Sequence, residues 1–555
     1  MRPIIYQIFT RLYGAAGKNP QPWGGRSLNG CGTMASLDAK ALARIREMGF
    51  THLWCTGLIR HATCTHYDGI PDCNPRVVKG IAGSPYAITD YYDIDPDLAV
   101  NPDKRREEYA ALVRRIHKAG LRLVIDFVPN HVSREYHSIC CPDGVRDLGA
   151  DDNASLAFSP SNNFYYIPGE ALHTDNLPVH DYAKSAPAYE EFPARATGND
   201  VMHAWPGAND WYETVKLNYG INYATGERCF SPLPDTWRKM TDILLHWAAT
   251  GVDAFRCDMA EMVPVEFWHY AITQVKAQYP GIRFIAEVYN PAQYRDYIRF
   301  GGFDYLYDKV GLYDCVRDVM CDRRWAGEIT HAWQSVDDIR PSMLGFLENH
   351  DEQRIASPQF AGSALPGRPG MIATAAVSTA PLMVYAGQEL GEPATDEEGY
   401  SGRDGRTTIF DYWSLAPLHR QRLGKLTPDE QSLQDFYRRL LCACNSSEAL
   451  REGGLYDLMY VNPPSEVFDA QHTYVCLRHT RSEVLLIVCN FTAEAKDASV
   501  IIPEEAFRHT GLKERKRAIL LPDLLSDYKA KTAILPNTPI KVTIPAYNGV
   551  ILRLM

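Results

Sequence analysis

The stretch that decides the fold is Gly251-Val252-Asp253-Ala254-Phe255-Arg256-Cys257-Asp258, an apolar run that ends in an arginine and a carboxylate. Its residues are typical of an interior strand. Side chains alternate along a strand, so Arg256 and Asp258 share one face and lie next to each other. An arginine beside a carboxylate lowers the pKa of that group and keeps it ionised, as a nucleophile requires. A structural ion pair would show the same pattern.

Four other apolar runs also end in polar residues. They are residues 121–128, which contain Asp126 and precede Asn130 and His131; 283–287, which end in Glu287; 343–347, which precede His350 and Asp351; and 381–385, which precede Glu389. Between such runs lie segments with helical periodicity, for example residues 109–116. Strand, loop, helix and strand in succession are typical of parallel α/β architecture.

The polar residues gather at the carboxyl ends of the strands, where a (β/α)8 barrel has its active site. A doubly wound nucleotide-binding sheet would need a glycine-rich first turn, which the sequence lacks. We therefore predict an α/β fold, a (β/α)8 TIM barrel formed by residues 1–131 and 219–447.

Two segments depart from this alternation. Residues 132–218 are rich in Pro, Asn, Asp and aromatic residues and too long for an ordinary loop, which predicts a small inserted domain after strand 3. Residues 448–555 contain short β-branched runs separated by turns, which predicts a C-terminal antiparallel β-sandwich. We expect rings of the insertion to form a wall over the barrel mouth; they are Tyr165, Tyr166, Trp205, Trp211 and Tyr212.

Composition excludes several classes of partner. The formal net charge is −11 over 555 residues and no Lys/Arg run stands out, so neither nucleic acid nor an anionic membrane is expected. No stretch approaches the ~18 apolar residues that would span a bilayer. The N-terminal residues run directly into a strand without the features of a signal peptide. We expect a cytoplasmic protein with reduced cysteines, and the sequence leaves its oligomeric state open.

One short segment is rich in possible metal ligands. It contains His52, Cys55, His61, Cys64, His66 and Cys73. Their spacings match no standard zinc pattern, so we interpret them as ordinary residues and keep zinc as the alternative.

Four motifs, in order and context, resemble those of the alpha-amylase family of glycoside hydrolases, and the resemblance covers nearly the whole chain. They are Asp126-Phe127-Val128-Pro129-Asn130-His131 for the third strand, Gly251 to Asp258 for the fourth, Phe284-Ile285-Ala286-Glu287-Val288 for the fifth, and Phe346-Leu347-Glu348-Asn349-His350-Asp351 for the seventh. Supporting matches occur at residues 86–90, 215–218 and 385–389.

This resemblance implies three catalytic carboxylates, with Asp258 as nucleophile, Glu287 as acid and then base, and Asp351 as the third. It implies substrate contacts from Tyr86, His131, Arg256 and His350, and structural support from Asp126 and Asn130. Retaining glycosidases hold two carboxyl groups about 5–5.5 Å apart. Asp258 and Glu287 end neighbouring strands, which are ~4.8 Å apart, so they can meet that requirement.

The sequence also departs from the family. Met259-Ala260-Glu261-Met262 stands where many alpha-amylases carry Lys and His, which makes calcium doubtful. We expect no required cofactor and name Asn130 as the one possible calcium ligand. Lys216-Leu217-Asn218 together with Glu261 resembles the neopullulanase and oligo-1,6-glucosidase side of the family.

The predicted function is hydrolysis of α-1,4-glucosidic bonds in maltooligosaccharides, with α-1,6 bonds left open as a second linkage. These oligosaccharides are the expected binding partners. Two alternatives stay open. A glucan transferase or isomerase would use the same glycosyl-enzyme intermediate, and an inactive carbohydrate-binding protein would keep only the fold.

Overall fold

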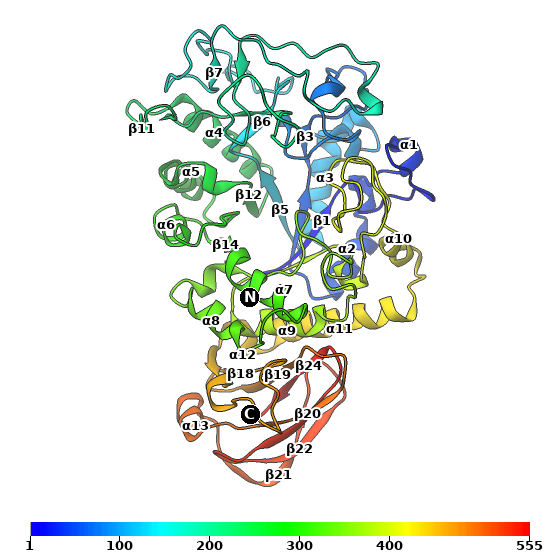
Figure 1. The fold of residues 1–555 in the computed structure, drawn as a ribbon, viewed down its shortest axis with the longest axis vertical. Helices are drawn as coiled ribbons and strands as arrows, with labels where there is room; N and C mark the ends of the chain where they lie inside the picture. Colours follow the sequence, from blue (N-terminus) through cyan, green and yellow to red (C-terminus); the bar gives the residue numbers. More distant parts are fainter. Residues whose placement is uncertain (1) are drawn as a thin grey trace.

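Eight parallel strands form one sheet in the computed structural model, which describes residues 2–555 (Figure 1). The strands are β1 (Ile4–Phe9), β2 (His52–Thr56), β5 (Arg122–Phe127), β12 (Ala254–Cys257), β13 (Arg283–Ala286), β14 (Tyr305–Tyr307), β15 (Met343–Leu344) and β16 (Leu382–Tyr385). A parallel bridge between Gly345 and Leu382 joins β15 to β16 and closes the barrel. The predicted (β/α)8 fold is confirmed.

The interior of the barrel is filled by one side chain from each strand. They are Ile5, Trp54, Val124, Ala254, Ile285, Tyr307, Leu344 and Met383, all at most 3% exposed. Side chains two positions further along a strand point to the same side. The next layer toward the carboxyl ends therefore holds the polar residues Gln7, Asp126, Arg256 and Glu287, directly above the apolar core.

Amphipathic helices surround the barrel. The larger ones are α2 (Ala39–Glu47), α3 (Arg105–Lys118), α4 (Asp235–Ala249), α5 (Val265–Gln278), α9 (Gly367–Val377) and α11 (Pro428–Ser446). In α3 the predicted apolar face is buried, since Tyr109, Leu112, Val113 and Ile116 all belong to the core. Helix α4 begins at Asp235, directly after its capping residue Pro234.

The sequence did not predict strand β14. It has three residues, and only Leu306 and Tyr307 are buried, so it lacks the long apolar run of the other strands. The shorter helices are α1 (Arg26–Asn29), α6 (Tyr294–Arg299), α7 (Asp314–Met320), α8 (Glu328–Gln334), α10 (Ala416–Leu423) and α12 (Glu448–Glu452).

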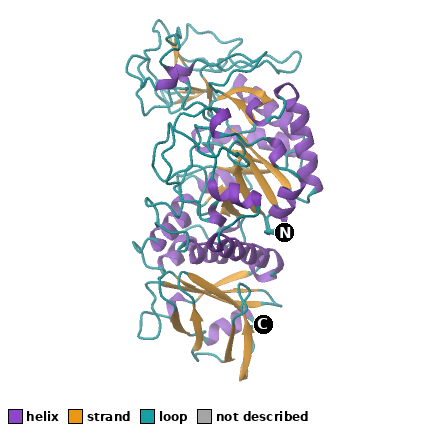
Figure 2. Ribbon diagram, turned by 90° about the vertical axis from the view of Figure 1, so that its right-hand side faces the viewer, coloured by secondary structure: helices purple, strands orange, loops and turns teal. Residues whose placement is uncertain are grey.

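The insertion lies at one end of the molecule and the C-terminal strands at the other (Figures 1 and 2). The insertion begins and ends in an antiparallel pair, β6 (His131–Ser133) with β9 (Thr214–Lys216). Between them, short strands β7 (Tyr166–Ile167) and β8 (Ala194–Arg195) are the main regular structure. The boundaries 132–218 and 448–555 stay predictions of the sequence.

The C-terminal region consists of antiparallel sheets around a separate apolar core. Strands β17 (Gly454–Asp457), β18 (Thr473–His479), β19 (Val484–Asn490) and β24 (Asn548–Arg553) form one sheet. The remaining strands form two pairs, β20 (Lys496–Val500) with β23 (Ile540–Ile544) and β21 (Arg515–Pro522) with β22 (Lys529–Ile534), next to α13 (Glu504–Thr510). The predicted antiparallel C-terminal fold is confirmed.

Two further observations concern the environment of the chain. Among residues 2–555, no helix is long and apolar enough to cross a membrane. All fourteen cysteines are free.

Candidate active site

A single buried guanidinium joins three carboxylates at the carboxyl ends of neighbouring strands. Arg256 Nη1 lies 2.7 Å from Asp258 Oδ1 and 3.4 Å from Asp126 Oδ1, and Arg256 Nη2 lies 2.7 Å from Glu287 Oε2. Asp126 pairs directly with Arg256 in the sheet, on β5. The parallel register of β5, β12 and β13 therefore brings together residues that the sequence separates by 130 and 31 positions.

Asp258 and Glu287 are held at matching heights on adjacent strands. The Asp258 amide donates to Phe127 O at 2.9 Å and the Glu287 amide donates to Cys257 O at 3.1 Å, so strand pairing continues past the ends of β12 and β13. Glu287 Oε2 accepts from the Met259 amide at 2.7 Å and Oε1 accepts from the Tyr289 hydroxyl at 2.6 Å. Both carboxylates are thus fixed in orientation.

The chain turns sharply after Asp258. Met259 has a φ of +43°, in the left-handed region that costs a non-glycine residue about 1–3 kcal/mol. This conformation aims the Met259 amide at Glu287. The strained backbone of Met259 therefore helps to hold Glu287, the predicted acid, in position.

The electrostatics of Asp258 differ from the sequence-based expectation. Burial raises the pKa of the Asp258 carboxyl well above its ordinary value; Arg256 opposes this shift, and the charges of Glu287, Asp351 and Asp126 add to it. Arg256 lowers this pKa as predicted, but the net shift is upward, so the expectation that the arginine decides the charge of Asp258 is wrong. One guanidinium shared among three carboxylates does not offset the loss of hydration and the repulsion between like charges.

His350 connects the third predicted carboxylate to the barrel interior. Its Nε2 lies 3.0 Å from Asp351 Oδ2 and also contacts the Tyr86 hydroxyl, while its Nδ1 lies 2.8 Å from the Gln7 amide nitrogen. The Tyr86 ring stacks on the His350 ring with centroids 5.3 Å apart. Burial pushes the pKa of Asp351 upward, but His350, Arg256 and Arg406 outweigh it and the net pKa is lowered.

His131 follows β5 on the other side of the site. Burial, together with the positive charges of Lys216 and Lys79, lowers the pKa of His131 to about 3. The imidazole is consequently neutral at ordinary pH and available as a hydrogen-bonding group. This state suits contact with an uncharged hydroxyl.

The residues around Asn130 do not fit calcium. The Asn130 side-chain oxygen accepts from the Lys216 ammonium, which also lies 2.7 Å from Asp200 Oδ1. Calcium requires six to eight oxygen ligands, and here a built-in cation already occupies the asparagine oxygen. The side-chain nitrogen of Asn130 donates to Gly198 O at 2.8 Å, so the amide has a structural role.

All three predicted carboxylates face one cleft with a volume of about 480 Å³. Tyr86 and His131 also line it, whereas Arg256 and His350 act from beneath as buried partners of the lining carboxylates. Of the five rings expected over the barrel mouth, only Trp211 lines the cleft. Tyr165 and Tyr212 are buried within the insertion, Tyr166 is half-buried and Trp205 is 52% exposed.

Sequence reasoning missed several residues that hold the site. Trp54 donates to Asp126 Oδ2 at 3.0 Å, and the Tyr307 hydroxyl accepts from Arg256 Nε at 3.2 Å. Gln7 and Tyr289 were also missed. A polar residue within the apolar run 4–9 is the signal that would have pointed to Gln7, because a polar group inside a barrel strand needs a partner.

The segment from His52 to Cys73 does not gather into a metal site. Among residues 2–555, the one group of three possible ligand atoms within 4.8 Å of one another is Asp90, Asp93 and Cys140. Arg60 and Arg105 pair with Asp93 at 3.3 and 2.7 Å, so arginines already neutralise this group. The interpretation of the cysteine and histidine cluster as ordinary residues agrees with this placement.

Glycosidases use a pair of carboxyl groups, and a (β/α)8 barrel holds such groups at the carboxyl ends of its strands. Residues 26–413 match the catalytic domain of the alpha amylases. The chain therefore belongs to the alpha-amylase family of glycoside hydrolases.

Known relatives are distant. Alpha-amylase 2 of Dictyoglomus thermophilum is 23% identical over 387 residues, which are 68% of this chain and 55% of that protein. The cyclomaltodextrinase of Geobacillus thermopakistaniensis is 21% identical over 521 residues, or 91% of this chain and 71% of the relative. The chain thus spans only about half the length of the first of these relatives.

Solved structures share the fold over the entire chain. A maltogenic alpha-amylase from Thermotoga neapolitana superimposes with a TM-score of 0.62 at 19% identity, covering 100% of this chain and 99% of that one. An alpha-amylase from Geobacillus thermoleovorans gives 0.65 at 17% identity, with coverage of 100% and 98%.

The raised pKa of Asp258 predicts where activity is lost in acid. A nucleophilic carboxylate must be charged, so kcat/KM falls as pH drops through this pKa. The acid limb of the pH profile should therefore lie above the ordinary aspartate value of about 3.9. Asp126→Asn removes one of the like charges and should move the limb to lower pH, while Asp68→Asn, fully exposed, should leave it unchanged. A wild-type limb at or below pH 4 would contradict this assignment.

The Lys216 ammonium predicts independence from calcium. Activity and melting temperature should survive dialysis against a chelator. Lys216→Met should lower the melting temperature by several degrees, because Asn130 and Asp200 lose their shared donor. Lys184→Met, which changes a lysine that is 67% exposed in the insertion, serves as the control. Complete loss of wild-type activity that calcium restores would refute the interpretation.

Proposed function

We propose that this chain is a retaining glycoside hydrolase that cleaves α-1,4-glucosidic bonds in maltooligosaccharides, with the α-1,6 bond as a second linkage. The observation that carries the proposal is the pair of buried carboxylates, Asp258 and Glu287, held 2.7 Å from the two ends of one guanidinium at the floor of the cleft. The family membership supports the same chemistry.

In the proposed first step, an Asp258 oxygen attacks the anomeric carbon while Glu287 gives its proton to the departing glycosidic oxygen. The glycosidic bond breaks and a covalent glycosyl ester forms on Asp258. In the second step, Glu287 takes a proton from water, whose oxygen attacks the same carbon and releases Asp258. Two inversions restore the α configuration.

The surrounding residues would stabilise the sugar and its transition state. Asp351, with a lowered pKa, remains charged and would favour the developing positive charge on the ring. Neutral His131 would hydrogen-bond a hydroxyl, and Tyr86 would offer an apolar face to the ring. His350 and Gln7 fix the position of Asp351 and Tyr86 from beneath.

The size of the cleft favours short substrates. Its volume of about 480 Å³ falls in the lower part of the range of roughly 300–1,000 Å³ for ligand pockets. Relatives named cyclomaltodextrinase, neopullulanase 2 and oligo-1,6-glucosidase support soluble oligosaccharides rather than granular starch. Fourteen free cysteines agree with a reducing compartment, and the cytoplasmic location stays a prediction.

The apolar lining of the cleft favours one alternative, transfer of the glycosyl group to a second sugar. Met259, Ile409 and Phe410 give part of the cleft an apolar lining. Such a lining would slow the entry of water to the glycosyl ester and leave time for a sugar hydroxyl to attack. Two relatives are named maltosyltransferases.

The carboxylates give the first test. Asp258→Asn and Glu287→Gln should each lower kcat by several orders of magnitude while the melting temperature changes little, because each variant keeps the shape of the side chain. Glu466→Gln, at an exposed position of the C-terminal region, is the matched control. Rates near wild type in either catalytic variant would overturn the mechanism.

Product analysis gives the second test. With maltoheptaose, proton NMR should show the α-anomer first, and chromatography should show glucose and shorter oligomers. A β-anomer as first product would exclude retention. Oligomers longer than the input would assign the chain to the transferases.

A further inference from the structure

A buried ion pair in the cleft takes no part in the chemistry proposed above. Lys79 Nζ lies 2.9 Å from Glu213 Oε2, the two residues are 7% and 5% exposed, and both line the cleft. Removing two charges from water is costly unless hydrogen bonds satisfy their remaining capacity. Among residues 2–555, no donor makes an aligned hydrogen bond to Glu213 Oε2. The Lys79 ammonium occupies this oxygen, and the pair as a whole belongs to the lining of the cleft.

The pair lies on the side of the cleft away from the leaving group. Glu287 follows β13 and must stand beside the departing sugar if it protonates the glycosidic oxygen. Lys79 belongs to the loop between β3 (Ile59–His61) and β4 (Ile88–Ile94), beyond β2, and Glu213 precedes β9, whose partner β6 follows β5. The strands follow one another around the barrel in the order β2, β5, β12 and β13, and Asp258 comes directly after β12. Lys79 and Glu213 therefore lie on the β2 and β5 side of Asp258, and Glu287 lies on its β13 side.

The chain closes the cleft behind Lys79. The Tyr182 hydroxyl from the insertion donates to Val78 O at 2.7 Å and accepts from the Gly80 amide at 3.0 Å. On the other side the Ala82 amide donates to Phe410 O at 3.1 Å. Gly80 has a φ of +74°, and a Cβ added there would lie 2.1 Å from Phe410 O, so the two backbones are in direct contact. Three separate segments thus form one wall.

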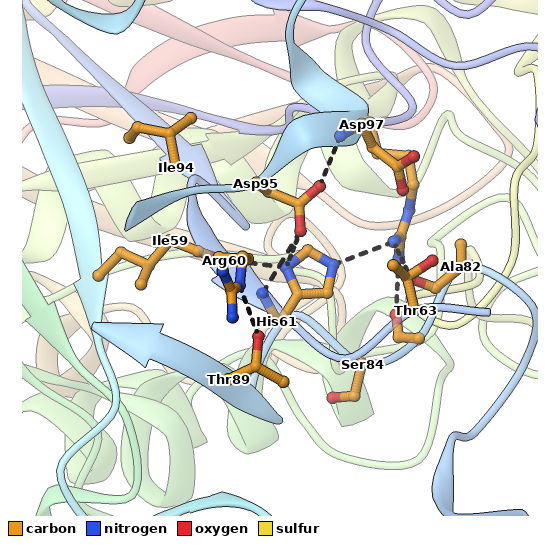
Figure 3. A network of polar contacts seen from close by, with 12 residues as sticks. Ile59, Arg60, His61, Thr63, Ala82, Ser84, Thr89, Ile94, Asp95 and Asp97 are labelled. Carbon is orange, nitrogen blue, oxygen red and sulfur yellow. Dashed lines mark hydrogen bonds and ion pairs between the residues drawn. The ribbon is translucent and has the colours of Figure 1, made fainter. Parts of the chain in front are cut away.

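A second buried arginine fixes this wall. The Arg11 guanidinium donates to Ala82 O at 2.8 Å, Gly83 O at 3.0 Å and Ile409 O at 2.8 Å, which ties the Lys79 loop to the segment that carries Phe410. Arg11 Nη1 also lies 3.3 Å from His61 Nε2. Figure 3 shows His61 bonded to Asp95, close to the loop that carries Ala82 and Ser84.

We propose that Lys79 and Glu213 bind the terminal hydroxyls of the sugar chain, so that the enzyme cleaves only from the non-reducing end. The ammonium donates and the carboxylate accepts, which matches two neighbouring hydroxyls of a sugar. The pair is neutral in total, so it suits an uncharged ligand better than a phosphate. A free 4-hydroxyl exists only at the chain end, and a further sugar beyond this pair would have to pass the wall formed by the three segments. This inference rests on the proposed hydrolysis.

The test compares maltoheptaose with the same oligosaccharide whose terminal 4- and 6-hydroxyls are joined in an ethylidene acetal. Release of shorter oligosaccharides is followed by chromatography. The wild-type enzyme should cleave the free substrate at least about a hundredfold faster than the blocked one. Equal cleavage of both would overturn the end-directed inference and leave the proposed hydrolysis intact. Cleavage of neither would overturn both.

Two variants connect this preference to the ion pair. Glu213→Gln should lower kcat/KM on free maltoheptaose by about ten- to a hundredfold, as expected for loss of a charged hydrogen bond of roughly 1.5–3 kcal/mol. The double variant Lys79→Ala with Glu213→Ala removes both charges together. It should reduce the ratio of the cleavage rate on free maltoheptaose to the rate on the blocked substrate at least tenfold. Glu190→Gln, exposed in the insertion, should change neither quantity.

A purely structural ion pair would give a different pattern. The variants would then lower the melting temperature and would lower the cleavage rates on free and blocked maltoheptaose by the same factor. The ratio of the two rates would stay unchanged. That result would overturn the inference, whereas a narrowed ratio with an unchanged melting temperature supports it.

Discussion

The Arg256 guanidinium is the constraint on which the site depends. It is fully buried, contacts Asp126, Asp258 and Glu287, and lies 5.4 Å from the Tyr86 ring centre. Each of these groups comes from a different segment of the chain, so the arginine joins strands β5, β12 and β13 to the loop before β4. Replacing Arg256 would leave Asp126, Asp258 and Glu287 buried without their shared cation, and an uncompensated buried charge costs about 3–5 kcal/mol.

The same arrangement leaves the site with an excess of negative charge. Three carboxylates share one arginine, and Asp351 adds a fourth. Burial then determines the balance: the pKa of Asp258 is raised, whereas that of Asp351 is lowered because His350 and Arg406 contact it. The same cluster therefore displaces the pKa values of two neighbouring carboxylates in opposite directions.

Two buried lysines hold carboxylates where the insertion meets the barrel. Lys216 occupies the oxygen of Asn130 and pairs with Asp200, so the junction between barrel and insertion is stabilised by an internal ammonium. Lys79, from the loop that the insertion covers, meets Glu213 in the cleft. Both lysines also lower the pKa of His131, which links these two ion pairs to the hydrogen-bonding state of a proposed sugar contact.

The sequence by itself determined the barrel and the strand ends that carry the proposed catalytic carboxylates, because alternation along a strand and a polar residue at its end are local patterns. Residues 251–258 and 283–287 therefore placed Asp258 and Glu287 on neighbouring strand ends. It did not reveal β14, whose three residues are too few to show a pattern. Tertiary structure alone decided the direction of the Asp258 pKa and the meeting of Lys79 with Glu213, 134 residues apart. Desolvation depends on everything that surrounds a group, and loop contacts depend on the whole chain path, so neither is written in any short stretch of sequence.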